Sequence, residues 1–502
     1  MSSCRQAAFL GIDVTTTEFA LAVRAADGAE DYAATPMRGA VRWQDDPAFP
    51  GFELGPVPDM LRELLGTLQG RGWEFRKASE PRRFLSVACR QHDLVALDRQ
   101  GIPLLPAISW QCNAARDDVR DLKAMGVEEA VGLIEPRFVL PKLRCILRRS
   151  AALREHIGTV FMTGDWIAYH LTGRRSLSTS DALSNGLLDQ GSRRRADAVL
   201  EAAGFDTAWF PDPIQSGEVV GVVQPPGETS DAWRPVKELL AGWEFVAGLG
   251  DNHASAVGCG MKADYRTLVV SAGTSGTVNL SCPATARLPA SGKSLRFEFY
   301  RDSLLLLSML GDCGAWYNRF LDGFAPGYRQ CLDDLNAMAL ACDFASLRRV
   351  LHSDEAHGES YAPSWPGAPL GEKVAGTQFS IALELLLRVK QMLEEVRAAE
   401  VCDVAQYVLT GGLSQSPFLQ QAFHAGVQCL APGAAVKVSG RTGPLRYKTS
   451  AYGALINAEL PLRGGSLERV HAEGNRFPLV ECPRPHYVKQ SQLRYLLRSY
   501  GL

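Results

Sequence analysis

The sequence predicts an α/β protein built from two similar domains, and three observations support this prediction. The chain has 502 residues, more than one hydrophobic core usually serves, so at least two domains are expected. Strand-like and helix-like segments alternate along it, which is typical of helices packed on sheets. Two distant stretches, 9–23 and 267–280, look alike. This similarity suggests a duplicated domain, with a loop from each half facing a shared cleft.

Each of the two similar stretches predicts a β-hairpin. An apolar segment is followed by a short turn of small residues and then by a second β-rich segment, the usual order of strand, turn and strand. The residues at the tips are Thr15, Thr16 and Thr17 in the first stretch, and Gly273, Thr274 and Ser275 in the second. We therefore expect hydroxyl groups and accessible backbone N–H groups at both tips.

The other elements follow from hydrophobic spacing and turn residues. Strands are expected at 84–88, 94–97 and 407–410, and helices at 143–154, 166–171, 380–397 and 418–425. Gly173 is expected to end the second of these helices. Helix 380–397 carries an apolar stripe at helical spacing, which predicts core packing rather than a cofactor site. We place the domain boundary after residue 244, which gives domains 1–244 and 245–502.

The composition argues against several classes of protein. A formal net charge of -2 gives no support for nucleic acid or an anionic membrane as the main partner. No apolar stretch approaches the roughly 20 residues that span a bilayer, and the first residues lack a signal-peptide pattern. The 12 cysteines form no C-x-x-C pair, so we expect free thiols in a reducing cytoplasm. The nine histidines show no metal-binding spacing.

The two hairpin tips offer groups that suit phosphate and a metal ion. Glycines let backbone N–H groups approach oxyanions, and hydroxyl groups add hydrogen bonds, so Gly273, Thr274 and Ser275 are candidate phosphate ligands. An ordinary tight turn is the alternative. In the first hairpin, Asp13 ends an apolar strand beside the threonines, where its carboxylate could hold Mg²⁺ directly or through water. The alternative is an aspartate that hydrogen-bonds its own turn.

Asp251 is the candidate catalytic base. It follows an apolar segment and Gly250, and it precedes small residues that are expected to open a helix. A carboxylate at this junction can accept the proton of a hydroxyl group that attacks a phosphate. Its alternative role is the N-cap of the helix, which aspartate often fills. Asp13 and Asp251, one from each half of the chain, should then converge on one nucleotide-filled gap.

A glycine-rich loop near the end of the chain is a candidate adenine site. A strand leads into Gly411 and Gly412, and the loop ends at Gln415. Ser416 and Pro417 predict the start of the next helix. Paired glycines would let a flat ring approach the backbone. Many α/β proteins contain such a turn, so an ordinary loop is the alternative.

In this order, the motifs resemble those of the FGGY family of carbohydrate kinases, within the actin-like ATPase superfamily. The resemblance covers most of the chain, and the order and spacing of the motifs are more specific than any one of them. The segments that carry it are 11–17, 171–189, 250–258, 271–277, 411–417 and 450–454. Within the family, segments 250–252 and 272–276 are most similar to those of xylulokinases.

The resemblance implies a fold and a set of roles. Two ribonuclease-H-like domains would flank a deep cleft, the first binding mainly sugar and the second mainly ATP, and closure would exclude water. Asp251 would be the base, and Asp13 would help to position Mg²⁺. The implied ATP-binding residues are Thr15, Thr16, Thr17, Gly273, Thr274, Ser275, Gly411, Gly412 and Gln415.

The resemblance also implies an acceptor site of His92, Trp110, Asp251 and Asn252. His92 lies where xylulokinases carry the histidine of a substrate motif, and Trp110 is similar to a glycerol kinase tryptophan that packs on the substrate. A core histidine and a buried tryptophan are the alternatives. The expected reaction is ATP-dependent phosphorylation of a ketose, D-xylulose first. The alternatives are another ketose or polyol (ribulose, sedoheptulose or a glycerol-like acceptor), or a catalytically weak sugar- or nucleotide-binding relative. A homodimer is an expectation from the family.

Overall fold

The structure of the chain is a computed structural model. It describes residues 5–76, 82–227, 232–289, 292–300, 302–328, 331–344, 347, 367–400, 403–439, 448–473, 479–499 and 501–502. The chain forms two compact units, and neither is one continuous segment. Unit 1 consists of Met1–Gly258, Arg296–Leu304 and Gly443–Asn475, and unit 2 of Cys259–Leu295, Leu305–Thr442 and Arg476–Leu502.

The division into units differs from the expected boundary after residue 244. Strand β14 (Glu244–Gly250) begins there, and it pairs with β7 (Phe84–Cys89) inside the sheet of unit 1. Helix α14 (Thr449–Glu459) belongs to the same unit although it comes from the far end of the chain. One contiguous cut cannot describe a unit that is completed by a strand and a helix from beyond residue 244.

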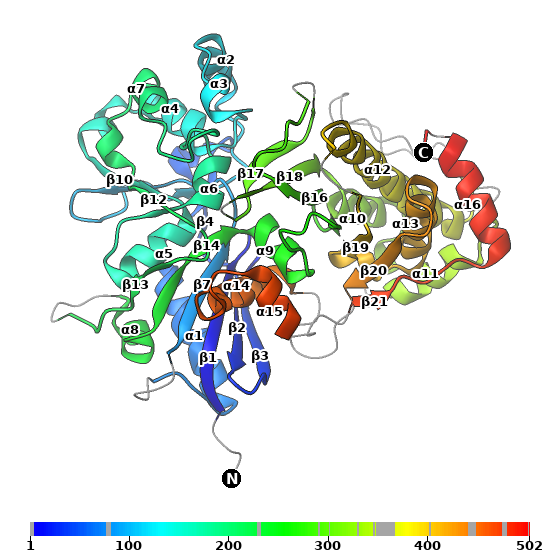
Figure 1. The fold of residues 1–502 in the computed structure, drawn as a ribbon, viewed down its shortest axis with the longest axis horizontal. Coiled ribbons are helices and arrows are strands. Elements are labelled where there is room, and N and C mark those ends of the chain that lie inside the picture. The colour runs from blue at the N-terminus through cyan, green and yellow to red at the C-terminus, as the bar shows by residue number, and fades with distance from the viewer. Residues whose placement is uncertain are drawn as a thin grey trace. The chain divides into compact units, whose positions relative to one another are not determined.

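A mixed seven-stranded sheet forms the centre of unit 1 (Figure 1). Its strand order is β13-β14-β7-β1-β2-β3, with β6 added beside β1. Strands β1, β7 and β14 run parallel, and β2, β3 and β13 run antiparallel to their neighbours. The further bounds are β1 (Arg5–Val14), β2 (Glu18–Ala25), β3 (Glu30–Pro36), β6 (Trp73–Glu74) and β13 (Val219–Val222).

Smaller sheets and short helices complete unit 1. A three-stranded sheet has the order β4-β5-β9, and β10 pairs with β8 and β11 with β12. The strands are β4 (Ala40–Arg42), β5 (Pro50–Phe52), β8 (Val95–Asp98), β9 (Ala107–Ile108), β10 (Ile157–Phe161), β11 (Leu177–Ser178) and β12 (Pro213–Ile214). The helices are α1 (Pro56–Gly70), α2 (Arg116–Ala124), α3 (Glu128–Val131), α4 (Val139–Arg149), α5 (Thr163–Thr172), α6 (Thr179–Ser184), α7 (Asp197–Ala202), α8 (Arg234–Leu240), α9 (Asp251–Gly258), α14 and α15 (Leu467–Glu473).

Unit 2 is built on a second seven-stranded sheet, with the order β17-β18-β16-β15-β19-β20-β21. Residues 296–304, where β17 ends and β18 begins, belong to unit 1. The strands are β15 (Thr267–Ala272), β16 (Gly276–Pro283), β17 (Leu295–Glu298), β18 (Ser303–Leu310), β19 (Gln406–Thr410), β20 (Ala435–Ser439) and β21 (Leu479–Glu481). The helices are α10 (Gly314–Phe324), α11 (Leu332–Ala341), α12 (Leu370–Ala398), α13 (Pro417–Leu430) and α16 (Tyr487–Ser499).

The two sheets repeat one topology. In unit 1 the hairpin β1–β2 is followed across the sheet by the parallel strands β7 and β14 and by the antiparallel edge strand β13. In unit 2 the hairpin β15–β16 is followed by the parallel strands β19 and β20 and by the antiparallel edge strand β21. The predicted duplication of a hairpin-led α/β domain is therefore confirmed.

Most predicted elements are present, with changed ends. Gly173 ends α5 in the left-handed conformation, with φ 72°. Helix 143–154 was expected to be continuous, but α4 stops at Arg149 and a separate 3₁₀ turn follows. Helix α12 begins at Leu370, ten residues before the apolar stripe that predicted it. The helix after Ser416 continues to Leu430, five residues beyond the expected end.

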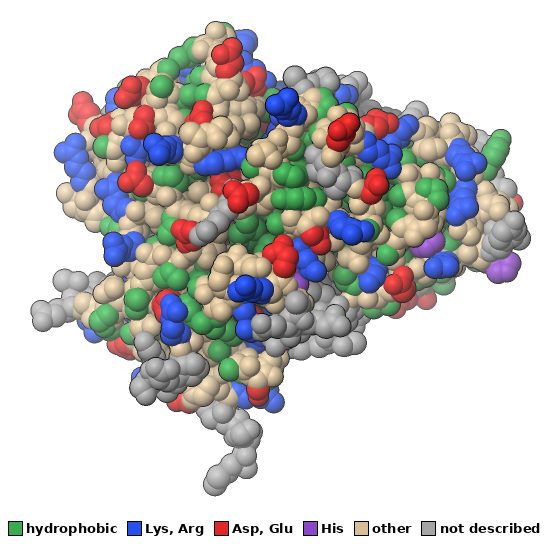
Figure 2. All heavy atoms as spheres, viewed as in Figure 1, with side chains coloured by type: hydrophobic (Ala, Val, Ile, Leu, Met, Phe, Trp, Pro, Cys, Tyr) green, Lys and Arg blue, Asp and Glu red, His purple; other side chains and the backbone are tan. Residues whose placement is uncertain are grey.

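The surface and the thiols agree with the composition. On the face drawn in Figure 2, side chains of both charges are interspersed over the described residues, as a net charge of -2 suggests. Ten cysteines in the described part of the chain carry free thiols. No helix within the described ranges is both long enough and apolar enough to cross a membrane.

Candidate functional site

The carboxyl ends of three parallel strands bring the two predicted carboxylates to one edge of the unit 1 sheet. The register pairs Asp13 of β1 with Ala88 of β7, and Ala88 with Leu249 of β14. Neighbouring strands lie about 4.8 Å apart, so the backbones at Asp13 and Leu249 are about 10 Å apart. Asp251 follows two residues later as the first residue of α9. Both carboxylates therefore belong to unit 1, and the expectation that they come from opposite halves differs from the structure.

Asp13 is an almost completely buried carboxylate, with 2% of its surface exposed. The hydroxyl of Ser450, in the first turn of α14, donates to Oδ2 at 2.5 Å. Oδ1 has no hydrogen-bond partner among the described residues. Burial raises the pKa of Asp13 to about 7; the hydrogen bond from Ser450 opposes this shift, and the negative charge of Asp251 adds to it. A cation bound at the unpartnered oxygen would favour the ionised form of Asp13.

Asp251 keeps some exposure to solvent at the start of its helix. Its Oδ1 accepts hydrogen bonds from the backbone N of Asn252 at 2.8 Å and from Nδ2 of the same residue at 3.3 Å. Burial is the main cause that raises the pKa of Asp251 to about 6; the hydrogen bond from Asn252 opposes it, and the charge of Asp93 adds to it. A carboxylate with this pKa is ionised at neutral pH and still basic enough to accept a proton.

The loop after β7 surrounds the site with hydrogen-bonding groups. Gln91 Nε2 lies 3.1 Å from His253 Nδ1, and Gln91 Oε1 accepts from Asn252 Nδ2 at 3.0 Å. Arg90 and Asp93 form a buried ion pair of 2.8 Å. Arg90 Nη1 also donates to the carbonyl of Thr15 at 3.2 Å, so the loop is tied to the first hairpin tip. These contacts fix the walls around Asp251.

His92 is packed into the protein interior on the same loop. Its backbone has a positive φ of 72°. The ring stacks on Phe138 at 4.7 Å, and Nδ1 lies 3.1 Å from Oδ1 of Asn185. Burial lowers the pKa of His92 well below its usual value, so the imidazole is neutral. This placement matches a core histidine whose backbone shapes the loop, and its role as a substrate ligand stays a prediction.

Trp110, in the loop after β9, contacts the first hairpin tip. Its indole Nε1 donates to the hydroxyl of Thr16 at 3.1 Å, and its backbone N donates to Asp93 at 3.1 Å. Thr15 closes the turn, since its backbone N and its hydroxyl both donate to the carbonyl of Glu18. Thr16 and Thr17 are exposed. The structure thus places Trp110 against the threonine tip, and its role as an acceptor-binding residue stays a prediction.

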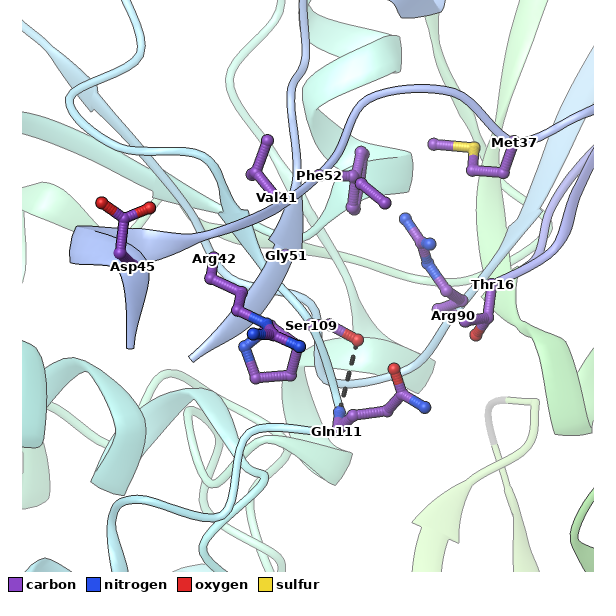
Figure 3. A pocket seen from close by; sticks show the side chains of 12 residues that line it. Thr16, Met37, Val41, Arg42, Asp45, Gly51, Phe52, Arg90, Ser109 and Gln111 are labelled. Atoms are coloured by element: carbon purple, nitrogen blue, oxygen red, sulfur yellow. Dashed lines mark hydrogen bonds between the residues drawn. The ribbon is translucent and has the colours of Figure 1, made fainter. Parts of the chain in front are cut away.

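A cavity of about 510 Å³ lies beside this tip in unit 1 (Figure 3). Its lining includes Thr16, Arg90 and Gln111, and the close-up shows Arg42 and Arg90 on opposite sides of Gly51. The guanidinium of Arg90 lies over the ring of Phe52 at 3.9 Å. Arg90 Nη2 is buried and has no hydrogen-bond partner within the described ranges. The remaining lining residues are Met37, Ala40, Val41, Asp45, Pro50 and Ser109.

In unit 2 the second hairpin tip and the glycine-rich loop lie against each other. Gly411 has φ 90°, and a Cβ atom there would lie 2.6 Å from the carbonyl carbon of Ala272. The backbone N of Gly314, at the start of α10, donates to the carbonyl of Gly273 at 2.8 Å. Gly412 faces open space, since a Cβ atom there would meet no atom within 4 Å. A glycine is therefore required at 411 by the close approach, and 412 leaves free room beside the tip.

The other predicted residues of unit 2 lie in the same two loops. Thr274 is exposed, and Ser275 and Gln415 are half-buried. Gln415 Nε2 donates to the hydroxyl of Ser414 at 3.1 Å. Ser416 caps α13, accepting from the backbone N of Leu419 at 3.3 Å, as predicted. These groups suit phosphate oxygens and a nucleotide, and their binding roles stay predictions.

The carboxylate of Asp13, beside the first hairpin tip, is suited to bind Mg²⁺. Asp13 Oδ1 is a buried oxygen without a partner in the described part of the chain. No group of three or more His, Cys, Asp or Glu side chains suited to a metal ion occurs among the described residues. Mg²⁺ commonly takes one or two carboxylates together with water and phosphate oxygens. Asp13 alone is thus an adequate protein ligand for Mg²⁺ that arrives with phosphates.

Several residues of the site were missed by the sequence analysis. The sequence places Ser450 in a helix, and no motif marks Lys448. Arg90 and Asp93 were passed over because a single ion pair three residues apart has no distinctive spacing. Only their position could have identified them, since Arg90 and Asp93 flank Gln91 and His92 directly after a buried strand.

Comparison with protein families and curated sequences gives partial matches. Residues 77–258 match the family model described as FGGY family of carbohydrate kinases, N-terminal domain. The chain is similar to the xylulose kinase of Escherichia coli (strain K12), at 31% identity over 195 residues, or 38% of this chain and 39% of that protein. It is 28% identical to the xylulose kinase of Streptomyces rubiginosus over 46% of this chain and 47% of that protein. An autoinducer-2 kinase of Escherichia coli (strain ATCC 8739) is 27% identical over 40% of this chain and 38% of that protein. The chain thus spans less than half the length of these relatives.

Solved structures resemble the whole chain. The xylulose kinase of Rhodospirillum rubrum has a TM-score of 0.79 at 19% identity, covering 98% of this chain and 97% of that one. A gluconate kinase of Lactobacillus acidophilus has a TM-score of 0.77 at 16% identity, covering 99% and 96%. The Plasmodium falciparum glycerol kinase with ADP has a TM-score of 0.76 at 13% identity, covering 99% of each chain. At these identities the likeness shows the fold alone, and the predicted two-domain α/β fold is confirmed.

Proposed function

We propose, from the match of residues 77–258 to the N-terminal domain model of the FGGY family of carbohydrate kinases, that the chain transfers the γ-phosphate of ATP to a hydroxyl group of a small sugar. The observation that carries the proposal is the pairing of Asp13 and Asp251 at one sheet edge, close enough for the charge of Asp251 to raise the pKa of Asp13. Phosphoryl transfer needs these two functions side by side: a place for metal-bound phosphate and a base at the acceptor.

Asp251 is the base in this proposal. With a pKa of about 6 it is ionised at neutral pH and accepts the proton of the acceptor hydroxyl as that oxygen attacks phosphorus. Asn252 holds the carboxylate by two hydrogen bonds, which fixes the direction from which the hydroxyl approaches. The ring of Trp110 and the amide of Gln91 supply an apolar face and a polar group for the rest of a sugar.

Asp13 and the hairpin tips bind the phosphates in this proposal. Asp13 Oδ1 would hold Mg²⁺, which when bound neutralises charge on the phosphate oxygens. The hydroxyls of Thr16 and Thr17 are exposed at the tip and can donate to phosphate oxygens. In unit 2, the tip around Thr274 would hold further phosphate oxygens, and the open space at Gly412 would receive the nucleoside.

A ketose is the proposed acceptor, with D-xylulose first. The support is the similarity of the chain to two xylulose kinases, at 31% identity over 38% of this chain and 28% over 46% of it. Autoinducer-2 kinase is a relative of comparable similarity, and gluconate and glycerol kinases share the fold. Acceptors other than xylulose are therefore part of the test.

The experiment is an acceptor panel scored by sugar-dependent ADP release. Pentuloses, hexuloses, heptuloses and polyols are each supplied with MgATP, and the Asp251→Asn protein is the control for contaminating kinases. Release with D-xylulose above the other acceptors supports the proposal in full. Release with another acceptor only would support the kinase assignment and would replace D-xylulose as the proposed acceptor. ATP binding without release for any acceptor would overturn the kinase assignment in favour of a binding protein.

A further inference from the structure

An amino group from the far end of the chain reaches the first hairpin tip. Lys448, directly before α14, places its Nζ 2.5 Å from Oε1 of Glu18, the residue that follows the threonines. The hydroxyl of Tyr32 donates to the same oxygen at 2.5 Å, and Nζ lies 5.5 Å from the centre of the Tyr32 ring. All of these residues belong to unit 1. Glu18 and Tyr32 together therefore hold Lys448 in one position beside the tip.

The position of Lys448 is fixed relative to Asp13 by the helix that follows it. Ser450, two residues later, donates its hydroxyl to Asp13 Oδ2. The charge of Lys448 acts on Asp13, where it opposes the rise in pKa that burial and the charges of Asp251 and Glu18 cause. The start of α14 thus provides a hydroxyl that donates to Asp13 and an ammonium group, paired with Glu18, whose charge acts on Asp13.

Charge at the tip favours an anion-binding role for Lys448. Asp13, Glu18 and Asp251 concentrate negative charge where a negatively charged phosphate has to bind. The side chain of Lys448 keeps 35% of its surface exposed and that of Glu18 31%, so a ligand can reach the ammonium group. An ion pair this exposed contributes only about 0–1 kcal/mol to stability. A structural role alone therefore explains little of this arrangement.

We propose that Lys448 is a phosphate-binding residue that donates to an oxygen of the transferred phosphoryl group at the first hairpin tip. The proposal rests on the proposed kinase function and names one further residue of its phosphate site. Lysine binds phosphate as a compact charge, and donation from a charged group is about twice as strong as a neutral hydrogen bond. Glu18 is a positioning residue, which orients the ammonium group and shares it with the phosphate when ATP binds.

The test compares Lys448→Met with Lys448→Arg and Glu18→Gln. Affinities for MgATP and MgADP are measured by calorimetry, which needs no turnover. Lys448→Met is expected to weaken MgATP binding by about 10- to 100-fold, as the loss of one charge-assisted hydrogen bond predicts. The affinity of Lys448→Met for MgADP, which lacks the transferred group, should fall by less than about threefold. Lys448→Arg should keep most of the MgATP affinity.

Glu18→Gln is the matched control because it breaks the ion pair and leaves the ammonium group. It should weaken MgATP binding less than Lys448→Met does, because the ammonium group remains and only its orientation by Glu18 is lost. Equal losses for Lys448→Met and Glu18→Gln, or equal losses for ATP and ADP, would overturn the proposal and leave a structural ion pair. An unchanged MgATP affinity in Lys448→Met would overturn it as well. Failure of the kinase function appears separately, as wild-type protein that binds ATP and transfers nothing to any acceptor.

Discussion

At the scale of single residues, hydrogen-bond partners rather than residue type distinguish the two acidic groups of the site. Asp13 and Asp251 have the same ordinary pKa, yet the environment raises the first to about 7 and the second to about 6. The difference follows from contacts, since Asp251 receives backbone hydrogen bonds from Asn252 and Gln91 that Asp13 lacks. Asp251 is thus held by hydrogen bonds in an ionised form that can accept a proton at neutral pH.

The first prediction concerns Asp251→Asn. The amide keeps the oxygen that accepts from the backbone N of Asn252, but it cannot accept the proton of an acceptor. Transfer should fall by about 10²- to 10⁴-fold, the usual contribution of a general base. Single-turnover rates measure the loss, and MgATP affinity by calorimetry should change less than about threefold. A variant that keeps half of the wild-type rate would remove Asp251 from this role.

The second prediction is a pH profile. Below a pH of about 6 the carboxylate of Asp251 takes up a proton and can no longer accept one from the acceptor. At saturating Mg²⁺, which keeps Asp13 ionised, kcat/KM should therefore be flat above that pH and fall by about tenfold per pH unit below it. Far-UV circular dichroism over the same range checks that the fold is retained. A profile without a limb between pH 5 and 7 contradicts the assignment.

The sequence predicted the site residues whose chemistry is local. Asp13 ends a strand and Asp251 opens a helix, and both positions can be read from neighbouring residues. It did not predict Ser450 or Lys448 as parts of the site, because their partners lie more than 400 residues away. A long-range hydrogen bond leaves no periodic trace in one sequence. Trp110 was predicted near the acceptor, but its bond to Thr16 was not.

At the scale of elements, two helices are in close contact through glycines. A Cβ atom on Gly453 of α14 would lie 1.8 Å from the carbonyl oxygen of Ala254 in α9. A Cβ atom on Gly258 of α9 would lie 1.8 Å from the carbonyl oxygen of Thr449. Helix α9 starts with Asp251 and α14 carries Ser450, so this contact sets the spacing of the site. The sequence predicted a helix of small residues after Asp251, but not the helix that it packs against.

The third prediction tests this contact with Gly453→Ala. The added methyl group has no space against backbone, so the helices must separate, at a cost of about 1–3 kcal/mol in the free energy of unfolding. Activity should fall as well, because Asp251 and Ser450 move apart. Urea denaturation measures the stability. Gly66→Ala in α1 is the control, since its Cβ atom would meet no atom within 4 Å; it should stabilise by about 0.5–1 kcal/mol.

Helix ends show the limits of hydrophobic spacing. The apolar stripe located α12 but placed its start ten residues late, because its first turns mix polar and small residues. The 3₁₀ turn after Arg149 was absorbed into the preceding helix because no proline or glycine separates them. Caps were more informative, and Gly173 and Ser416 were each placed correctly.

At the scale of the whole molecule, unit 1 depends on the far end of the chain. Asn457 of α14 donates to the hydroxyl of Ser86 at 2.7 Å and to the carbonyl of Ala247 at 2.8 Å. These bonds join α14 to β7 and β14. A Cβ atom on Gly11 of β1 would lie 2.5 Å from the carbonyl oxygen of Ala451. The helix therefore covers three parallel strands whose buried side chains require a partner.

The fourth prediction follows for a fragment of residues 1–258. Without α14 the fragment leaves the apolar faces of β1, β7 and β14 uncovered, and it should show no cooperative unfolding transition. Thermal unfolding followed by near-UV circular dichroism measures this, with the full chain as the reference. A fragment with a sharp transition and the near-UV signal of packed aromatic rings would contradict the dependence on α14.

The return of α14 also has a consequence for synthesis in the cell. When residue 258 leaves the ribosome, about 200 residues must still be translated before α14 can reach the sheet. At typical elongation rates this takes roughly 10 to 40 s. During that time the nascent first unit carries an uncovered apolar surface, so folding of this protein should depend on chaperones that bind nascent chains.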